Sequence, residues 1–342
     1  DMSESDKAAV YADIYLIALV IPLISVSGVL LGGVLQRRRA AHLRAQGMAE
    51  ERVQSLLFLP TQKTEINWWI FGGGLVFVCF TLAVGLSELQ FAQEVVFVGA
   101  MSIVLFMMYR LVLELEPAAR RALVGTALII FMFRAVPLPG PGVTWFEIDV
   151  LGFDQQFLSV LSLITAVLTL VGIVVLRPLM ATRSIASIVV LLTLAGAILS
   201  LPNIGLYYGI QEWTSKLTGG VVDAHFIALI DTALESPLGQ VAMVPMLAWI
   251  ARNAPVHLKA TFFAVMASFT NLALSASSLG TKYLNELFVV TREVRDPLPG
   301  VVETAADYSQ LGWLLITVAV IGLSLPLLVV VLVQSSPLRT RQ

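Results

Sequence analysis

Long apolar runs alternate with short polar segments along the chain. Nine runs approach or exceed the roughly 20 residues with which a helix crosses a bilayer, at residues 11–35, 68–86, 91–113, 122–138, 157–175, 185–206, 221–251, 260–283 and 311–333. The run at 221–251 is longer than a bilayer requires and contains Pro237 and Pro245, so we expect a tilted or kinked helix there. The pattern predicts an all-α membrane protein with about nine transmembrane helices.

The composition supports this prediction and argues against some classes of function. Of the 342 residues, 58% are hydrophobic and 13% are charged, whereas soluble domains are about a quarter charged. The lipid bilayer is therefore the expected surrounding. Basic runs interleaved with aromatic residues are absent, so nucleic acid is not an expected partner. The single cysteine, Cys79, lies in an apolar run and predicts neither a disulfide nor a cysteine metal site.

The basic residues predict the orientation, because short cytoplasmic loops are enriched in lysine and arginine. Alternate loops on one side hold Arg37, Arg38, Arg39, Arg44, Arg52, Lys63, Arg110, Arg120, Arg121, Arg177, Arg183, Arg252, Lys259, Arg339 and Arg341. The other side holds Lys7, Lys216, Lys282, Arg292 and Arg295. We therefore expect the C-terminus in the cytoplasm and, with nine spans, the N-terminus outside. The cytoplasmic segment 48–57 is expected to be a solvated loop, with a short amphipathic helix as the alternative.

The N-terminal segment favours a chain that has lost upstream spans. Residues 1–12 are acidic and polar, with neither a basic region nor a cleavage site, so no signal peptide is predicted. The first residue is Asp1 rather than methionine. An outside N-terminus without a signal peptide is explained most simply if further spans precede it.

Two segments carry a family resemblance. The first runs from Glu235 to Asn271 and includes Gly239-Gln240, Pro245, Ala254-Pro255 and Ala260-Thr261-Phe262. The second, residues 146–176, has Leu151-Gly152-Phe153 leading into a helix. Both resemble the folate-biopterin transporter family of the major facilitator superfamily.

This resemblance implies spans four to twelve of a twelve-helix transporter, with the first three missing. Residues 1–113 would form a partial N-terminal bundle of three spans with a cytoplasmic loop at 36–67, and residues 114–342 a complete six-helix bundle. The resemblance also implies uptake of a small organic anion or pteridine-like compound by proton symport. The expected location is the bacterial inner membrane.

Charged side chains within the spans are the first candidates for a site, because each costs about 2.5–3.5 kcal/mol near the bilayer centre unless it is paired or hydrated. Arg134 and Glu235 lie at similar expected depth, in spans that the family resemblance places across a transport cavity. Asp231 lies one turn from Glu235 on the same helix face. We predict that Arg134 pairs with Glu235 or Asp231 and that a carboxylate there couples transport to protons; a static ion pair, or an arginine that reaches the surface, is the alternative. Asp13 is expected at the interface or facing the cavity.

Two amides and a stripe of small residues come next. Gln240 and Asn271 fall near mid-membrane, where an amide can bind a heteroaromatic or carboxylate ligand or join two helices. The stripe favours close helix packing over ligand contact and comprises Ala260, Ala264, Ala267, Asn271, Ser275 and Ser278.

Signatures of enzymes and ATP-driven pumps are missing from the sequence. It has neither the glycine loop that binds phosphates nor the Gly-x-Ser-x-Gly nucleophile motif, and its three histidines are far apart along the chain. We expect no enzyme activity and no cofactor or metal. A secondary transporter is the favoured function; a non-transporting membrane assembly factor, or one that delivers a pigment or cofactor, is the alternative with the same fold.

Overall fold

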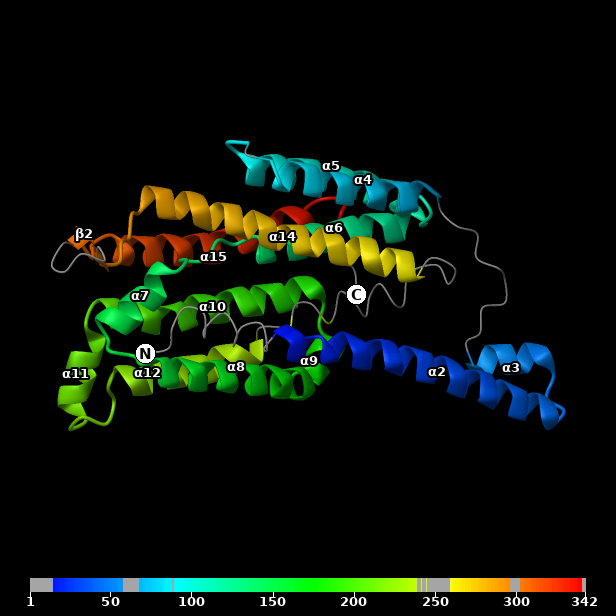
Figure 1. Ribbon diagram of the computed structural model, residues 1–342, viewed down its shortest axis with the longest axis horizontal. Helices are drawn as coiled ribbons and strands as arrows, with labels where there is room; N and C mark the ends of the chain where they lie inside the picture. The colour runs from blue at the N-terminus through cyan, green and yellow to red at the C-terminus, as the bar shows by residue number, and fades with distance from the viewer. Residues whose placement is uncertain are drawn as a thin grey trace. The chain divides into compact units, whose positions relative to one another are not determined.

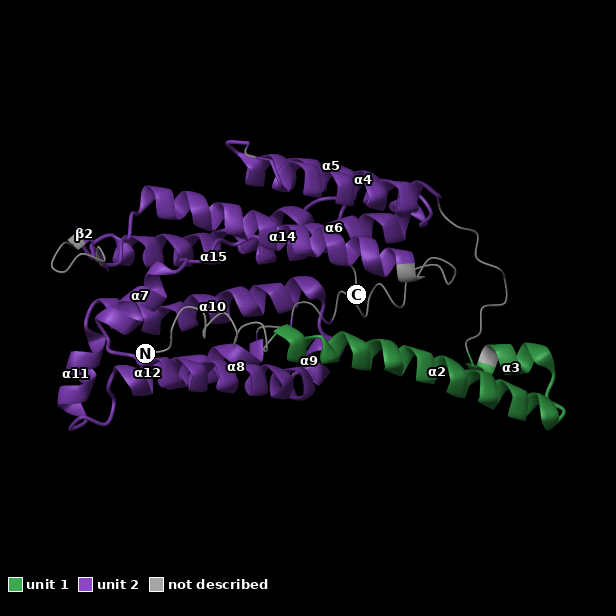
Figure 2. Cartoon of the chain, in the orientation of Figure 1, with its two compact units in different colours: residues 1–66 green, residues 67–342 purple. Residues whose placement is uncertain are grey.

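The chain forms two compact units, residues 1–66 and 67–342 (Figure 2). The structure, a computed structural model, describes residues 15–57, 68–87, 89–238, 241, 244, 259–295 and 302–339. The division predicted after residue 113 from the twelve-helix scheme stays a prediction.

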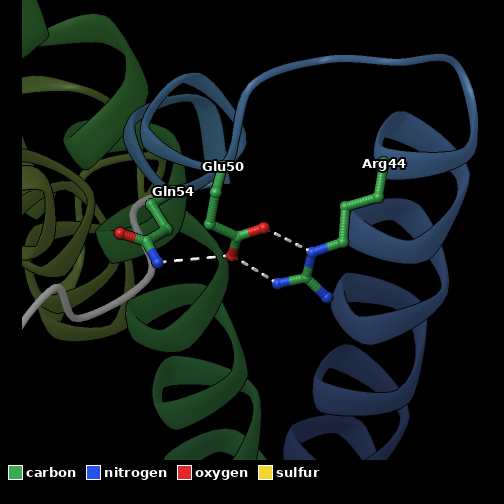
Figure 3. A network of polar contacts seen from close by, with 3 residues as sticks. All are labelled: Arg44, Glu50 and Gln54. Carbon is green, nitrogen blue, oxygen red and sulfur yellow. Dashed lines mark hydrogen bonds and ion pairs between the residues drawn. The ribbon is translucent and has the colours of Figure 1, made fainter.

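The first unit consists of a long helix and a short one. Helix α2 (Val20–Ala45) turns at Gly47, whose φ of 78° lies in the region that glycine adopts most readily, and α3 (Glu50–Leu57) follows (Figure 1). Arg44 holds the start of α3, because its Nε and Nη2 donate to the two oxygens of Glu50 at 2.7 and 2.6 Å (Figure 3). The expectation of a plain loop at 48–57 was therefore wrong, and the amphipathic helix forms.

The second unit is a helix bundle with one small β-hairpin (Figure 1). Its helices are α4 (Trp68–Gly85), α5 (Ala92–Val112), α6 (Pro117–Arg134), α7 (Gly142–Asp149), α8 (Gln155–Val175), α9 (Arg177–Thr182), α10 (Ile185–Tyr207), α11 (Ile210–Leu217), α12 (Ala224–Glu235), the 3-10 turn η1 (Ser236–Leu238), α14 (Lys259–Leu287) and α15 (Leu311–Gln334). The antiparallel strands β1 (Val294–Arg295) and β2 (Val302–Thr304) lie between α14 and α15.

Seven helices in the described part of the chain are long and apolar enough to cross a membrane: residues 15–45, α4, α5, α8, α10, residues 261–287 of α14, and α15. These helices, with the helical character of the rest, confirm the predicted all-α membrane bundle, and the protein is an integral multi-pass membrane protein. The predicted span at 122–138 coincides with α6, which carries Arg120, Arg121 and Arg134. The predicted span at 221–251 begins with α12 and η1 and then enters residues outside the described ones.

Large apolar side chains hold the bundle together. The main core joins α5, α6 and α14 through residues that include Val104, Leu123, Phe262 and Met266, all 4% exposed or less. Helix α10 packs along α15, and α8 packs against η1. At that last contact, Thr169 donates a hydrogen bond to the carbonyl of Ser236 at 3.0 Å, and a Cβ on Gly172 would lie 2.3 Å from the carbonyl oxygen of Pro237. Position 172 therefore requires glycine.

A polar clasp joins α7 to the segment that leads into α15. Arg292 donates to both oxygens of Asp149 at 3.0 and 2.8 Å, and the hydroxyl of Tyr308 donates to Asp149 at 2.6 Å. These contacts, chiefly that of Arg292, hold the pKa of Asp149 below its ordinary value. Burial, with Asp149 beside it, raises the pKa of Tyr308 to about 12. The clasp therefore ties α7 to the segment between α14 and α15.

Candidate functional site

A cavity of about 390 Å³ is lined by residues between Phe133 and Gly322. Its walls come from α6 and the proline-rich segment after it, α7, α10, α12 and α15. Most of the lining is apolar, and the polar side chains are Thr193, Ser200 and Asn203 from α10 and Glu235 from α12. We call this the carboxylate cavity.

Asp231 is the buried acid next to this cavity. Its side chain lies on α12, and the residue is 7% exposed. Asn203 donates from Nδ2 to Oδ2 of Asp231 at 3.0 Å, whereas the buried Oδ1 has no hydrogen-bond partner among the described residues. Pro202, inside α10, removes one backbone hydrogen bond just before Asn203. The cavity-lining amide thus connects the buried acid to the cavity.

Glu235 is the carboxylate that reaches the cavity itself. It is the last residue of α12, four residues after Asp231, so the two acids share a helix face. Their negative charges repel each other. In contrast to Asp231, Glu235 is exposed, and its side chain lines the cavity.

A third acid, Glu147, was missed in the sequence analysis. It lies on the short helix α7, outside the membrane-spanning segments, where its charge interacts with that of Asp231. Burial, and then the charge of Asp231, raises the pKa of Glu147 above its ordinary value. The sequence does contain a sign of this acid: Glu147 follows Trp145-Phe146 and precedes Ile148, so it stands among apolar residues.

Arg134 lies at a different point of its helix from the one predicted. Helix α6 begins at Pro117 and ends at Arg134, so the arginine is the last helical residue, whereas the predicted span at 122–138 continues for four residues beyond it. The chain leaves the helix because Pro137 disfavours the helical conformation in the residue before it. The Nε of Arg134 is buried without a hydrogen-bond partner in the described part of the chain.

The predicted ion pair is not formed in this structure. Among the described residues, no contact within 4 Å joins Arg134 to Asp231 or Glu235. A functional pairing at another stage of the transport cycle stays a prediction.

The remaining candidates are placed as follows. Asn271 is exposed on α14 and does not line the carboxylate cavity. Gln240 and Asp13 lie outside the described residues. The expectation that the small-residue stripe of α14 packs closely was wrong for Ser275 and Ser278, which are exposed and line a different cavity. Large residues such as Phe262 and Met266 make the close contacts of α14 instead.

The acids do not form a metal site. Among the described residues, no group of three or more histidine, cysteine, aspartate or glutamate side chains is arranged to hold a metal ion. His225 instead packs between Phe153 and Phe157, with ring centroids 4.8 and 4.7 Å away.

Comparison with known proteins decides the family. The BT1 family model matches residues 16–340. The chain belongs to the BT1 family. This match, together with a curated relative named as a folate-biopterin transporter, confirms the resemblance to that family.

That relative of the BT1 chain comes from Synechocystis sp. (strain ATCC 27184 / PCC 6803 / Kazusa). It is 27% identical over 158 residues, which cover 46% of this chain and 31% of the relative. The aligned segment thus covers about a third of the length of the curated relative. No solved structure matches the chain.

Proposed function

We propose that this BT1 chain is part of a secondary active transporter that moves a small organic anion, such as a folate or a pteridine-like compound, across the bacterial inner membrane. Family membership and the name of the Synechocystis relative support the substrate class. Transport would be driven by protons through alternating access, with the C-terminus in the cytoplasm. Such a protein catalyses movement and no chemical reaction.

One observation supports this proposal most directly: two acids of α12, one lining the carboxylate cavity and one beside it, have no cation partner among the described residues. Asp231 receives one hydrogen bond from Asn203, Glu235 lines the cavity, and neither forms an ion pair with a described residue. A carboxylate in apolar surroundings is stabilised by a counter-charge, by water or by a proton. These two acids are therefore our candidates for proton coupling.

We assign roles to the charged residues from their burial and from their described partners. Asp231 is buried and hydrogen-bonded, so we assign it the proton that is carried. Glu235 is accessible from the cavity, so it passes protons to Asp231 or senses the charge of the substrate. Arg134, whose Nε lacks a described partner, is the cation available to an anionic substrate when the helices rearrange.

The polar lining also bears on the alternative function. A membrane assembly factor would fill such a cavity with large apolar side chains, whereas here Thr193, Ser200, Asn203 and Glu235 face it. Because one fold serves several functions, uptake must be measured.

The test is uptake of labelled folate, biopterin and a panel of organic anions into vesicles that contain the full-length protein, with and without an imposed pH gradient. Glu235→Gln and Asp231→Asn keep the shapes of the side chains and remove their charges. We expect gradient-driven uptake to fall at least tenfold in both, in line with a coupling energy of about 1.4 kcal/mol or more. Glu212→Gln, an exposed acid on α11 that lines neither cavity, is the matched control and should transport normally.

Uptake that is independent of the gradient, or unchanged in both variants, would remove proton coupling from this site. Absence of uptake of every compound by folded protein would favour the assembly factor.

A further inference from the structure

A second and larger cavity, of about 970 Å³, lies between α4, α5 and α14, with Trp145 of α7 at its edge. We call it the lysine cavity. Among the described residues that line it, Lys282 is the one with a charged side chain. Its volume falls in the range that holds a drug-sized ligand, about 300–1,000 Å³.

The polarity of the lysine cavity changes along its length. Its lining on α14 extends from Leu272 to Asn285, a distance of about 20 Å at 1.5 Å per residue. Around Leu272 lie the apolar Ala100 and Phe77, which belong to the same core cluster. Lys282 lies ten residues further along α14, about 15 Å from Leu272. The cavity thus offers apolar walls and one charged side chain, which are the features that an amphiphilic anion requires.

Lys282 has capacity for a further acceptor. Its Nζ donates to Oε1 of Glu94 at 2.6 Å and lies 5.4 Å from the centroid of the Tyr283 ring. An ammonium group carries three N–H donors, so two remain beyond the bond to Glu94. Glu94 itself does not line the cavity, and its Oε2 is buried without a partner among the described residues. An anionic group in the cavity can therefore contact Lys282 directly, with the carboxylate of Glu94 2.6 Å from Nζ on a residue that does not line the cavity.

Further hydrogen-bonding groups line the cavity. In the part of the chain that the structure describes, no hydrogen bond engages the side chains of Gln93, Trp145 or Ser275. Gln93 and Ser275 are exposed, so water can serve them while the cavity is empty. The hydroxyl of Thr81 is buried without a described partner, which is costly unless a ligand or bound water satisfies it.

We propose that the lysine cavity binds an amphiphilic organic anion, with its acidic head on Lys282 and its apolar body between Phe77, Phe97 and Leu272. The ligand is a water-soluble aromatic acid or a membrane amphiphile with a single acidic head, since both present the same chemistry. This site is separate from the carboxylate cavity, and its occupancy is measured by binding without transport. Failure here would leave the proposed transport function untouched.

The experiment uses the full chain in nanodiscs of phosphatidylcholine, with empty nanodiscs subtracted. Calorimetric titration compares 2-naphthoate with its neutral analogue 2-naphthamide, and palmitate is tested by displacement of bound 2-naphthoate and by direct titration. We expect 2-naphthoate or palmitate to bind, 2-naphthamide to bind at least tenfold more weakly than 2-naphthoate, and Lys282→Gln to weaken the acids about tenfold or more. Binding of palmitate alone identifies a membrane amphiphile, and binding of 2-naphthoate alone a soluble acid.

Three variants separate a binding role of Lys282 from a structural one. Glu94→Gln breaks the ion pair but keeps the lysine, so acid binding should be unchanged or tighter. Glu286→Gln removes an exposed charge that acts on Lys282, with the same expectation. Ser275→Trp fills the cavity from an exposed position and should abolish binding without altering any charge. The proposal fails if neither acid binds, if 2-naphthamide binds as tightly as 2-naphthoate, or if Glu94→Gln weakens binding as much as Lys282→Gln.

Discussion

The carboxylate cavity and the lysine cavity handle charge in opposite ways. In the carboxylate cavity, acids on α12 have one described donor, Asn203, and no described ion-pair partner. In the lysine cavity, Lys282 is already paired with Glu94 at 2.6 Å. The first site therefore has acids without a described counter-charge, whereas the second has its lysine already paired with an acid.

The largest effect on stability that we expect comes from the packing of α8 beside the end of α12, next to the carboxylate cavity. Gly172→Ala places a Cβ against the backbone of Pro237, next to the end of α12, so α8 or η1 must move. We expect a loss of about 1–3 kcal/mol, typical of overpacking, and a disturbed carboxylate cavity. Thermal unfolding in detergent measures the change.

The matched control is a glycine that lines the carboxylate cavity. Gly196 of α10 lines it with no atom within 4 Å of a built Cβ, so Gly196→Ala should stabilise α10 by up to about 1 kcal/mol through helix propensity. Equal melting temperatures for the two variants would show that the contact of α8 with η1 is not tight.

An intermediate loss of stability is expected when a polar contact beside either cavity is removed, and the loss should differ between the two cavities. Asn203→Leu leaves both oxygens of the buried Asp231 without a described donor, which should cost about 1–3 kcal/mol. Glu94→Gln breaks a pair whose side chains are 19% and 36% exposed, so water compensates and the loss should be smaller. A larger loss of stability from Glu94→Gln than from Asn203→Leu would contradict this expectation. The ion pair beside the lysine cavity would then contribute more to stability than the hydrogen bond to Asp231.

The smallest effect that we expect concerns two acids on α7, whose charges change the stability of the fold in opposite directions. Burial raises the pKa of Glu147, so this residue destabilises the fold once the pH exceeds the ordinary value of about 4.3. Arg292 lowers the pKa of Asp149, so its stabilisation is complete above about 3.9 and is lost as the pH falls through the lowered pKa. At pH 7, Glu147→Gln should therefore raise the melting temperature slightly, and Asp149→Asn should lower it.

A pH series from 3 to 8 checks both signs. Glu147→Gln should approach the parent protein at the acid end, since Glu147, with its raised pKa, is then protonated. The deficit of Asp149→Asn should persist to a lower pH, because the pKa of Asp149 is lowered. Shifts in the same direction at pH 7 would contradict the assignment of these two environments.

Much of the fold was predictable because a bilayer restricts the choices. Apolar length and loop charge locate helices such as α8, α10 and α15 without reference to packing. Helix α6 was found by the same means, but its ends were displaced: the residues 117–121, with two arginines, look like a loop and form the first helical turns after Pro117.

The site was harder to predict, because contacts across the bundle leave weak local signals. Asp231 and Glu235 were recognisable as charges in an apolar run. The hydrogen bond that Asn203 donates to Asp231 from 28 residues away could not be recognised from the sequence. Glu147 belongs to a short helix between spans, so a search of the spans alone misses it. The stripe of small residues on α14 suggested packing, whereas Ser275 and Ser278 border open space. Small side chains allow either outcome, and the neighbouring helices decide.

The clasp on Asp149 has a consequence for how the protein is made. Its partners Arg292 and Tyr308 follow it by 143 and 159 residues. At the usual 5–20 residues per second, the ribosome reaches Arg292 roughly 7–30 s after Asp149. The clasp on α7 can therefore form only after the segment between α14 and α15 has been made. A chain stopped before residue 292 would hold every wall of the carboxylate cavity except α15 and would lack the clasp.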